Sequence, residues 1–245
     1  MIDLHCHLLP GIDDGPATPE QALELAALAV ANGITHATVT PHVHPGRYEN
    51  TTASITAVLE AFRAGLAEHN IGLQLGMAGE VRISPEILIM VEQGLVPFLG
   101  QWQGKQVMLL ELPHSHVPPG SDKLVQWLLD RNIQPMIAHP ERNKDVMRDL
   151  DKITPFVELG CLFQLTAMSV AGRFGEAAEH RALDLLEMGV VTIIASDAHN
   201  VKHRPPDLEP GRAAAARIVG EEESWRLVRE RPLQIAQSLF TETAA

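Results

Sequence analysis

Histidines and carboxylates gather at the ends of short apolar segments of this sequence. His5 and His7 close the first such segment, and Asp197 and His199 follow a strongly β-branched one. One residue separates the members of each pair, so both side chains of a pair point to the same face of a strand. Two imidazoles on one face at a strand end match the edge of a metal site. The sequence therefore predicts metal-assisted chemistry at these positions.

Side chains of the same types occur near the ends of other apolar segments: Asp13 or Asp14, His42, Glu80, Glu111 and His139. Taken singly, each is more often a hydrogen-bonding or capping residue than a ligand. Together they favour a metal centre, because buried charges that converge must be paired or must coordinate a cation. Nine such residues are too many for one ion. The mixed imidazole and carboxylate set suits Zn²⁺, Mn²⁺ or Fe²⁺ better than Ca²⁺, so we expect two or three such ions.

These candidate ligands can form one metal centre only in a fold that brings the ends of the strands together. Short apolar segments alternate with helical ones, which is typical of parallel βα units. We expect strands at 2–7, 35–40, 73–81, 107–112, 134–139, 162–166 and 190–196, and helices at 18–32, 51–69, 85–93, 122–131, 176–188, 211–219 and 222–229. Seven or eight units in 245 residues favour an α/β barrel with its site at the C-terminal ends of the strands.

An open doubly wound sheet is the alternative fold. Against it, no Gly-x-Gly-x-x-Gly follows the first strand, and the loop with Gly11 and Gly15 lacks the Lys-Ser/Thr ending of a phosphate loop. We expect residues 1–245 to form one domain.

Composition restricts the class of protein further. The apolar content of 45% excludes intrinsic disorder, and the net charge of −12 argues against a nucleic-acid binder. The longest segment without charged residues, 25–46, contains polar groups that lipid would leave unsatisfied. The N-terminal residues have neither a basic segment nor a long apolar one, so we expect no secretory leader. Cys6 and Cys161 cannot form a disulfide framework and suit a reducing compartment. We expect a cytoplasmic protein without membrane insertion.

Two arginines follow strands of the expected barrel. Arg142 comes after the strand at 134–139, and Arg204 comes after the strand at 190–196. A guanidinium group matches phosphate oxygens with two parallel hydrogen bonds. The alternative for each is an ion pair with a carboxylate at the same rim. Weaker candidates for substrate contact at this rim are His44, Arg47, Arg82, His114 and His116.

The opening, MIDLHCHLLPGIDDGP, resembles the start of the PHP (polymerase and histidinol phosphatase) superfamily. Further matches, in the family's order, are Thr40-Pro41-His42, Gly79-Glu80, Leu110-Glu111, Ile137 to Arg142, Ala195 to Asn200 and Arg204-Pro205-Pro206. They reach from residue 1 to about residue 206. More narrowly, the chain resembles the PHP-type protein tyrosine phosphatases of bacterial capsule and exopolysaccharide operons, the CpsB/CapC/YwqE group. Glu111 favours this branch, because several other PHP branches carry His there.

The resemblance implies a distorted (β/α)7 TIM-like barrel with three divalent metal ions, usually manganese, with iron or zinc as alternatives. Carried over position by position, His5, His7, Glu80 and Asp197 would bind one ion. Glu80, Glu111 and His139 would bind a second ion. Asp14, His42 and His199 would bind a third ion. Arg142 and Arg204 match arginines that contact phosphate.

The function implied is hydrolysis of phosphotyrosine by a water that the metal ions activate, with Arg142 and Arg204 stabilising the phosphate oxygens. The implied partner is an autophosphorylating bacterial tyrosine kinase of polysaccharide export. A cysteine mechanism is not expected, because Ile12 and Ala167 stand where Cys-x5-Arg would need arginine. Three alternatives remain open at this point: a phosphatase for a small monoester such as histidinol phosphate, a PHP nuclease, and a metal-binding regulatory partner without turnover.

Overall fold

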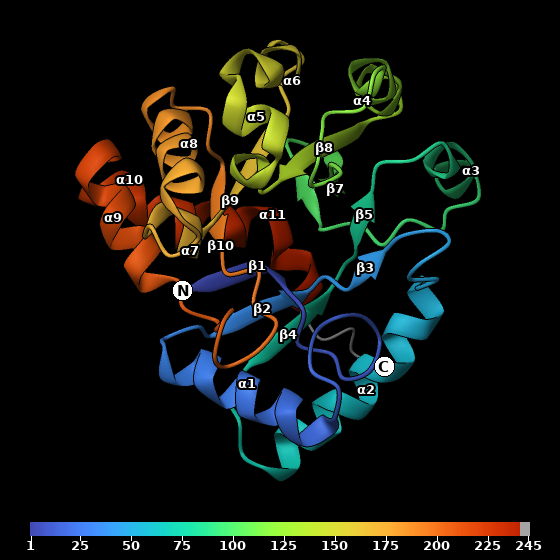
Figure 1. Cartoon of the computed structure of the whole chain (residues 1–245). Helices are drawn as coiled ribbons and strands as arrows, with labels where there is room; N and C mark the ends of the chain where they lie inside the picture. Colours follow the sequence, from blue (N-terminus) through green and yellow to red (C-terminus); the bar gives the residue numbers. More distant parts are fainter. Residues whose placement is uncertain (241–245) are drawn as a thin grey trace.

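The computed structural model describes residues 1–240, in which helices surround a set of parallel strands (Figure 1). The strands are β1 (Ile2–Cys6), β2 (His36–Val39), β3 (His42–Val43), β4 (Gln74–Met77), β5 (Glu80–Arg82), β6 (Gln101–Trp102), β7 (Lys105–Glu111), β8 (Ile133–Ala138), β9 (Leu162–Thr166) and β10 (Ile193–Ala195). The α-helices are α1 (Pro19–Ala31), α2 (Thr52–Glu68), α3 (Glu86–Glu92), α4 (Ser121–Leu129), α5 (Lys144–Arg148), α6 (Thr154–Glu158), α7 (Ala167–Val170), α8 (Glu176–Glu187), α9 (Glu209–Val219), α10 (Glu221–Trp225) and α11 (Arg231–Phe240). Over residues 1–240, no helix has both the length and the apolar character needed to cross a membrane.

Two parallel sheets form the wall of the barrel. One contains β1, β2 and β4 in that order, and the other runs β3, β5, β7, β8, β9, β10, with β6 paired antiparallel to β7. After a short break, β2 continues into β3 and β4 continues into β5. Gly79 lies in the second break, where a Cβ atom would come within 2.7 Å of the Pro97 and Val43 side chains. Counted this way, the described residues form seven parallel strands, as expected for a distorted (β/α)7 barrel.

The first and last strands meet and close the barrel. Cys6 and Ala198 form a parallel bridge just beyond the end of β10. The Asp197 N–H donates to the His5 carbonyl at 2.7 Å, and the His7 N–H donates to the Ala198 carbonyl at 2.8 Å. This closure confirms the predicted barrel. The alternative fold, an open doubly wound sheet, is wrong, because an open sheet would leave β1 and β10 apart.

A bulge in β1 determines which of its side chains face the barrel interior. The pairing of β1 with β2 changes register between Asp3 and Cys6. Leu4 packs in the interior cluster with residues of β7 and β8, whereas Cys6 packs in the outer layer with residues of α1 and α2. Because a bulge re-aims the side chains that follow it, His5 and His7 point into the same end of the barrel interior.

Both long N-terminal helices begin within one residue of the expected positions. The Thr18 side chain accepts a hydrogen bond from the Gln21 N–H at the start of α1, where Pro19 occupies the first turn. A capping box between Thr51 and Ser54 begins α2. These caps satisfy backbone N–H groups that a helix start leaves free, which is why the sequence locates both starts well.

The expected helices end at residue 229, whereas the structure continues as helix to residue 240. A π-helical turn, Arg226–Glu230, leads into α11, whose Ile235 and Ala236 belong to the interior cluster of the barrel. The Phe240 ring lies 5.0 Å from the ring of His36, the first residue of β2. Helix α11 therefore closes the amino end of the barrel, and it lies behind the strands in Figure 1.

We predict that Ile235→Ala lowers the free energy of unfolding by about 2–4 kcal/mol, because the side chain is buried among the barrel strands. Leu233→Ala on the same helix is the control, since Leu233 is 41% exposed and its loss should cost under about 0.5 kcal/mol. Urea unfolding of both variants measures the difference. Equal losses of unfolding free energy in the two variants would contradict the conclusion that α11 closes the amino end of the barrel.

Candidate metal centre

The carboxyl ends of the strands bring the nine expected ligands into one basin. They come from the end of β1 and the loop after it (His5, His7, Asp14), from β3 (His42), β5 (Glu80) and β7 (Glu111), and from the segments after β8 (His139) and β10 (Asp197, His199). Their ligand atoms form four overlapping groups, within each of which all atoms lie within 4.8 Å of one another. The groups are His7-Asp14-His42-His199, His5-His7-Glu80, His5-His139-Asp197 and His42-Glu80-Glu111.

Glu80 lies at the middle of the basin and is 1% exposed. Its Oε1 atom lies 2.8 Å from Nε2 of His139. Its Oε2 atom lies 2.8 Å from Nδ1 of His42, 3.4 Å from Nε2 of His5 and 3.5 Å from Nε2 of His7. Its two oxygens face different imidazoles, so this carboxylate joins the two sides of the basin.

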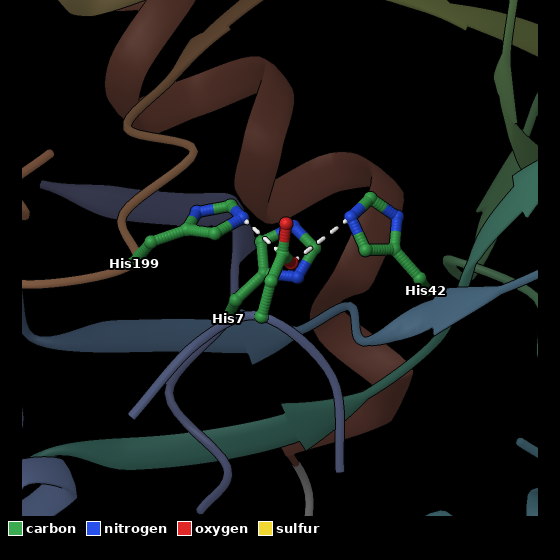
Figure 2. A group of neighbouring side chains, drawn as sticks. His7, His42 and His199 are labelled. Atoms are coloured by element: carbon green, nitrogen blue, oxygen red, sulfur yellow. Dashed lines mark ion pairs between the residues drawn. The ribbon is translucent and has the colours of Figure 1, made fainter. Parts of the chain in front are cut away.

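Asp14 completes a second part of the basin, nearer to solvent. Its Oδ1 atom lies 3.2 Å from Nε2 of His42 and 3.2 Å from Nε2 of His199. Figure 2 shows His42 and His199 pointing toward each other from opposite sides, with the two ion pairs meeting between them and with His7 beside them. Three imidazoles and one carboxylate converge here.

Asp13 has a different place from Asp14. Its Oδ2 atom accepts a hydrogen bond from Nδ1 of His7 at 2.7 Å and another from the His42 N–H at 3.1 Å. Gln164 does the same for His5, with its Oε1 atom 2.8 Å from Nδ1. Each partner fixes the orientation of the imidazole ring that it contacts. Metal-binding histidines usually have such a hydrogen-bond partner on the ring nitrogen that does not bind the metal. The sequence analysis missed Gln164, although a polar residue within the apolar strand β9 was a usable signal.

Asp197 joins the basin to the two expected phosphate-binding arginines. Its Oδ1 atom lies 3.5 Å from Nε2 of His5 and 3.4 Å from Nε2 of His7. Its Oδ2 atom accepts hydrogen bonds from both Arg142 and Arg204. The ion pairs considered from the sequence as an alternative for both arginines are therefore formed.

A pocket of about 320 Å³ opens directly over the basin. Its walls include the expected ligands Asp14, His42, Glu80, Glu111, His139 and Asp197, together with Arg47, Arg82, His114, Arg142, Asn143 and Arg204. His44 and His116, the other weaker candidates, do not line it. Four guanidinium groups around one small pocket indicate an anionic ligand, and the paired planar groups suit phosphate oxygens.

The donor atoms of the basin fit divalent cations. His42 Nδ1, Glu80 Oε2, Glu111 Oε2 and His199 Nε2 are buried and make no well-formed hydrogen bond. They contact other ligand-type atoms only as ion pairs, of Glu80 and Glu111 with His42 and of His199 with Asp14. Buried polar atoms in folded proteins are almost always hydrogen-bonded, so this arrangement indicates a further group that they would bind. Imidazole nitrogens and carboxylate oxygens are ligands of Mn²⁺, Fe²⁺ and Zn²⁺. Arg82 holds the other oxygen of Glu111 at 2.8 Å.

Without cations, the charges in the basin are balanced by protons. Burial lowers the pKa of His42, but the carboxylates of Glu80 and Asp14 outweigh burial and raise that pKa to about 10. Burial and the negative charge of Glu80 raise the pKa of Glu111 to about 8. Both side chains therefore hold a proton near neutral pH, and a cation that binds there must displace it.

Two of the expected ligands have strained backbones. His139 has φ of 31° and Asp197 has φ of 52°, the left-handed region that side chains other than glycine rarely adopt. Each costs of the order of 1–3 kcal/mol and is kept only where the surroundings enforce it, which is common at functional sites. Both residues follow the end of a strand, so the unusual turn sends their side chains into the basin.

A barrel whose strand ends converge on imidazoles, carboxylates and arginines defines the class of protein: a metal-dependent hydrolase with a TIM-like fold. The phosphotriesterase homology protein of Escherichia coli shares this fold, with a TM-score of 0.60 at 12% identity over 96% of this chain and 98% of that one. Residues 1–237 match the model of the family described as "Capsular polysaccharide synthesis, CpsB/CapC". The chain belongs to this family.

Several tyrosine-protein phosphatases are similar to this chain over most of their length. Tyrosine-protein phosphatase YwqE of Bacillus subtilis is 36% identical over 205 residues, which are 83% of this chain and 79% of YwqE. Tyrosine-protein phosphatase CpsB of Streptococcus pneumoniae is 24% identical over 241 residues, 96% of this chain and 98% of CpsB. A structure from work on YwqE and CpsB, described as unique metal-dependent tyrosine phosphatases, superposes with a TM-score of 0.89 at 31% identity over 98% of this chain and 96% of that one.

We predict that metal affinity rises with pH. The raised pKa of His42 means that its proton competes with a cation below about pH 10, and the raised pKa of Glu111 adds a second proton below about pH 8. Titration calorimetry with Mn²⁺ at pH 6.5 and pH 8.0 should show tighter binding at the higher pH and release of protons to the buffer. Equal affinity at both pH values, without proton release, would contradict the placement of the cations at these ligands.

Proposed function

We propose that this chain is a metal-dependent protein-tyrosine phosphatase. The observation that carries the proposal is a single pocket, lined by arginines, over a basin of ligand-type side chains. YwqE and CpsB, whose family the chain shares, are tyrosine-protein phosphatases. The proposed reaction is hydrolysis of the phosphate ester of phosphotyrosine in a protein.

The cofactor we propose is three divalent ions, with manganese as the first choice and iron or zinc as alternatives. As the family resemblance implies, one ion would be held by His5, His7, Glu80 and Asp197, a second by Glu80, Glu111 and His139, and a third by Asp14, His42 and His199. The four groups of neighbouring ligand atoms overlap these sets but divide the same nine residues differently, with His139 beside His5 and Asp197 and with His42 beside Glu80 and Glu111. When bound, such ions lower the pKa of a nucleophilic water and offset the charge of the phosphate.

The arginines of the pocket would bind and orient the phosphate group. Arg142 and Arg204 both line the pocket and both donate to one oxygen of Asp197, so their guanidinium groups are held on the same side of the basin. The ring of Phe174 lies 5.0 Å from the Arg142 guanidinium carbon and adds a cation–π contact. This preorganised pair would stabilise the negative charge on the phosphate oxygens during attack.

A cysteine nucleophile is a poor alternative for this chain. Cys6 is fully buried, its side chain packs in the outer layer of the barrel, and burial raises the pKa of its thiol well above the ordinary value. Burial raises the pKa of Cys161 to about 12. Neither thiol lines the arginine pocket, and a reactive cysteine needs a lowered pKa and access to substrate.

The wider setting is proposed from the family. The substrate would be a phosphotyrosine protein, such as an autophosphorylating tyrosine kinase of polysaccharide export, in the cytoplasm. Residues 1–245 would act as one PHP domain. No role with nucleic acid is proposed, given the net charge of −12.

We predict metal-dependent release of phosphate from a phosphotyrosine peptide. Protein freed of metal with a chelator should be inactive, and addition of Mn²⁺ should restore activity together with two to three bound ions per chain. Histidinol phosphate and a short DNA are the comparison substrates. Bound metal without turnover of the peptide would overturn the proposed substrate, and a failure to bind metal would overturn the proposed centre.

We predict that Arg142→Ala lowers kcat/KM for the peptide about 10²- to 10³-fold, because a charged donor to the transition state is lost. The metal content of this variant should be unchanged. Arg148→Ala on α5 is the matched control, since that side chain is 71% exposed. Wild-type kinetics in Arg142→Ala would exclude the role of Arg142 in phosphate binding.

A further inference from the structure

An apolar groove lies next to the arginine pocket, between α3 and α4. Its volume is about 470 Å³, and its main apolar walls are Ile83, Pro85, Leu88, Leu124 and Trp127. Figure 1 shows α3 and α4 as neighbours at the edge of the barrel, on the other side of the molecule from α9. The proposed reaction does not use this groove.

The helix on one side of the groove, α3, exposes apolar side chains between the exposed carboxylates of Glu86 and Glu92. Ile87 is fully buried, whereas Leu88 is 38% exposed and Ile89 is 57% exposed. Leu95, shortly after the helix, is 43% exposed. A helix that packs on a core from one side normally carries polar residues on the other side, so this surface has the character of a contact site.

Residues that are close in the chain line the pocket and the groove. Arg82 lines the pocket, and the next residue, Ile83, lines the groove. Leu112 lines the pocket, and Pro118 in the loop after it lines the groove. Consecutive Cα atoms are about 3.8 Å apart, so a ligand that fills the pocket lies within a few residues' reach of the groove.

The wall between them is fixed by hydrogen bonds. Asn143, itself in the pocket, donates through Nδ2 to the carbonyls of Pro113 at 2.7 Å and His116 at 2.8 Å. The Val117 N–H donates to the carboxylate of Asp145 at 3.1 Å. Because this loop is already held, a ligand in the groove does not have to order it, which favours binding.

The groove complements an apolar side chain. Lys123 is the one charged residue among those that line it in the described chain, which contrasts with the four arginines of the pocket. Trp127 contributes a large ring, and tryptophan is among the residues that contribute most at protein interfaces. A polypeptide that places an anion in the pocket could place an apolar side chain here.

We propose that the groove between α3 and α4 binds an apolar side chain of the substrate polypeptide, close in sequence to the phosphotyrosine in the pocket. This inference rests on the proposed phosphatase function. It makes the groove a specificity site, which favours phosphotyrosines that have an apolar neighbour. Its position beside the pocket, with Arg82 and Ile83 adjacent in the chain, favours the substrate over a second copy of the chain as the occupant.

The test uses phosphotyrosine peptides that differ only in the position of one leucine, stepped from four residues before to four residues after the phosphotyrosine, with serine elsewhere. Leu88→Ser is the test variant. Ile218→Ser is the matched control, because Ile218 is also 38% exposed on a helix, α9, and lines neither pocket nor groove. Free phosphotyrosine, which cannot reach the groove, is the reference substrate.

We expect leucine at one or two positions to lower KM about tenfold relative to the all-serine peptide, in line with burial of one leucine side chain. Leu88→Ser should abolish that gain and leave kcat and the kinetics on free phosphotyrosine unchanged. Ile218→Ser should behave as the wild type. The proposal is overturned if leucine lowers KM nowhere, or if Leu88→Ser impairs free phosphotyrosine equally. A wild-type dimer in sedimentation that Leu88→Ser dissociates would also overturn it, because a second copy would then fill the groove.

Failure of the phosphatase function gives a separate result. If neither free phosphotyrosine nor the peptides are hydrolysed, the peptides persist, and fluorescence anisotropy of labelled peptides measures their Kd directly. Tighter binding of the leucine peptide that is lost in Leu88→Ser then supports the groove by itself, whereas equal Kd values reject it.

Discussion

Carboxylates and imidazoles crowd the carboxyl end of this barrel more densely than they can satisfy one another. Glu80 and Asp197 are each 1% exposed, and His5 and His7 are buried beside them. The bulge in β1 and the left-handed backbone of His139 and Asp197 aim side chains of this group into the basin. A group of this kind is tolerable in a protein interior only with compensating positive charge, from protons, guanidinium groups or metal ions. The architecture is therefore organised around a need for cations.

Asp197 contacts both the imidazoles of the basin and the arginines of the pocket. One oxygen faces His5 and His7, and the other holds Arg142 and Arg204. The same carboxylate thus touches the groups suited to hold metal and the groups suited to hold phosphate. Because the arginines are fixed relative to the basin, a phosphate that binds them is brought over the ligand atoms without a large rearrangement, which is how preorganised sites lower a barrier.

The sequence predicted the barrel and the convergence of the ligand-type residues well, because both depend on local patterns. Strand-ending residues such as Glu80 and His139 share a basin as soon as the strands are parallel and the sheet closes. Features that depend on distant partners were missed. Helix α11 has an amphipathic pattern that was a usable signal, but its place at the end of the barrel depends on strands far away in the chain that receive Ile235. Gln164 gains its role only when β9 lies beside His5. Asp13 and Asp14 are alike in sequence, and only the turn that follows β1 gives them different neighbours.

The seam between β1 and β10 has a consequence for how the protein is assembled. The Ser196 hydroxyl donates to the buried Asp3 carboxylate across 193 positions of the chain, at the same seam where His5 and His7 meet Asp197. Some residues of the basin, such as His5 and His7, are therefore translated first, whereas Asp197 and His199 come much later in the chain. Pairing between such distant segments slows folding, because a long loop must close first. A cation that needs ligands from both segments would bind only the closed barrel, and its binding would add to the free energy of unfolding by mass action. The supply of metal ions would then govern the stability of the folded chain as well as its catalysis.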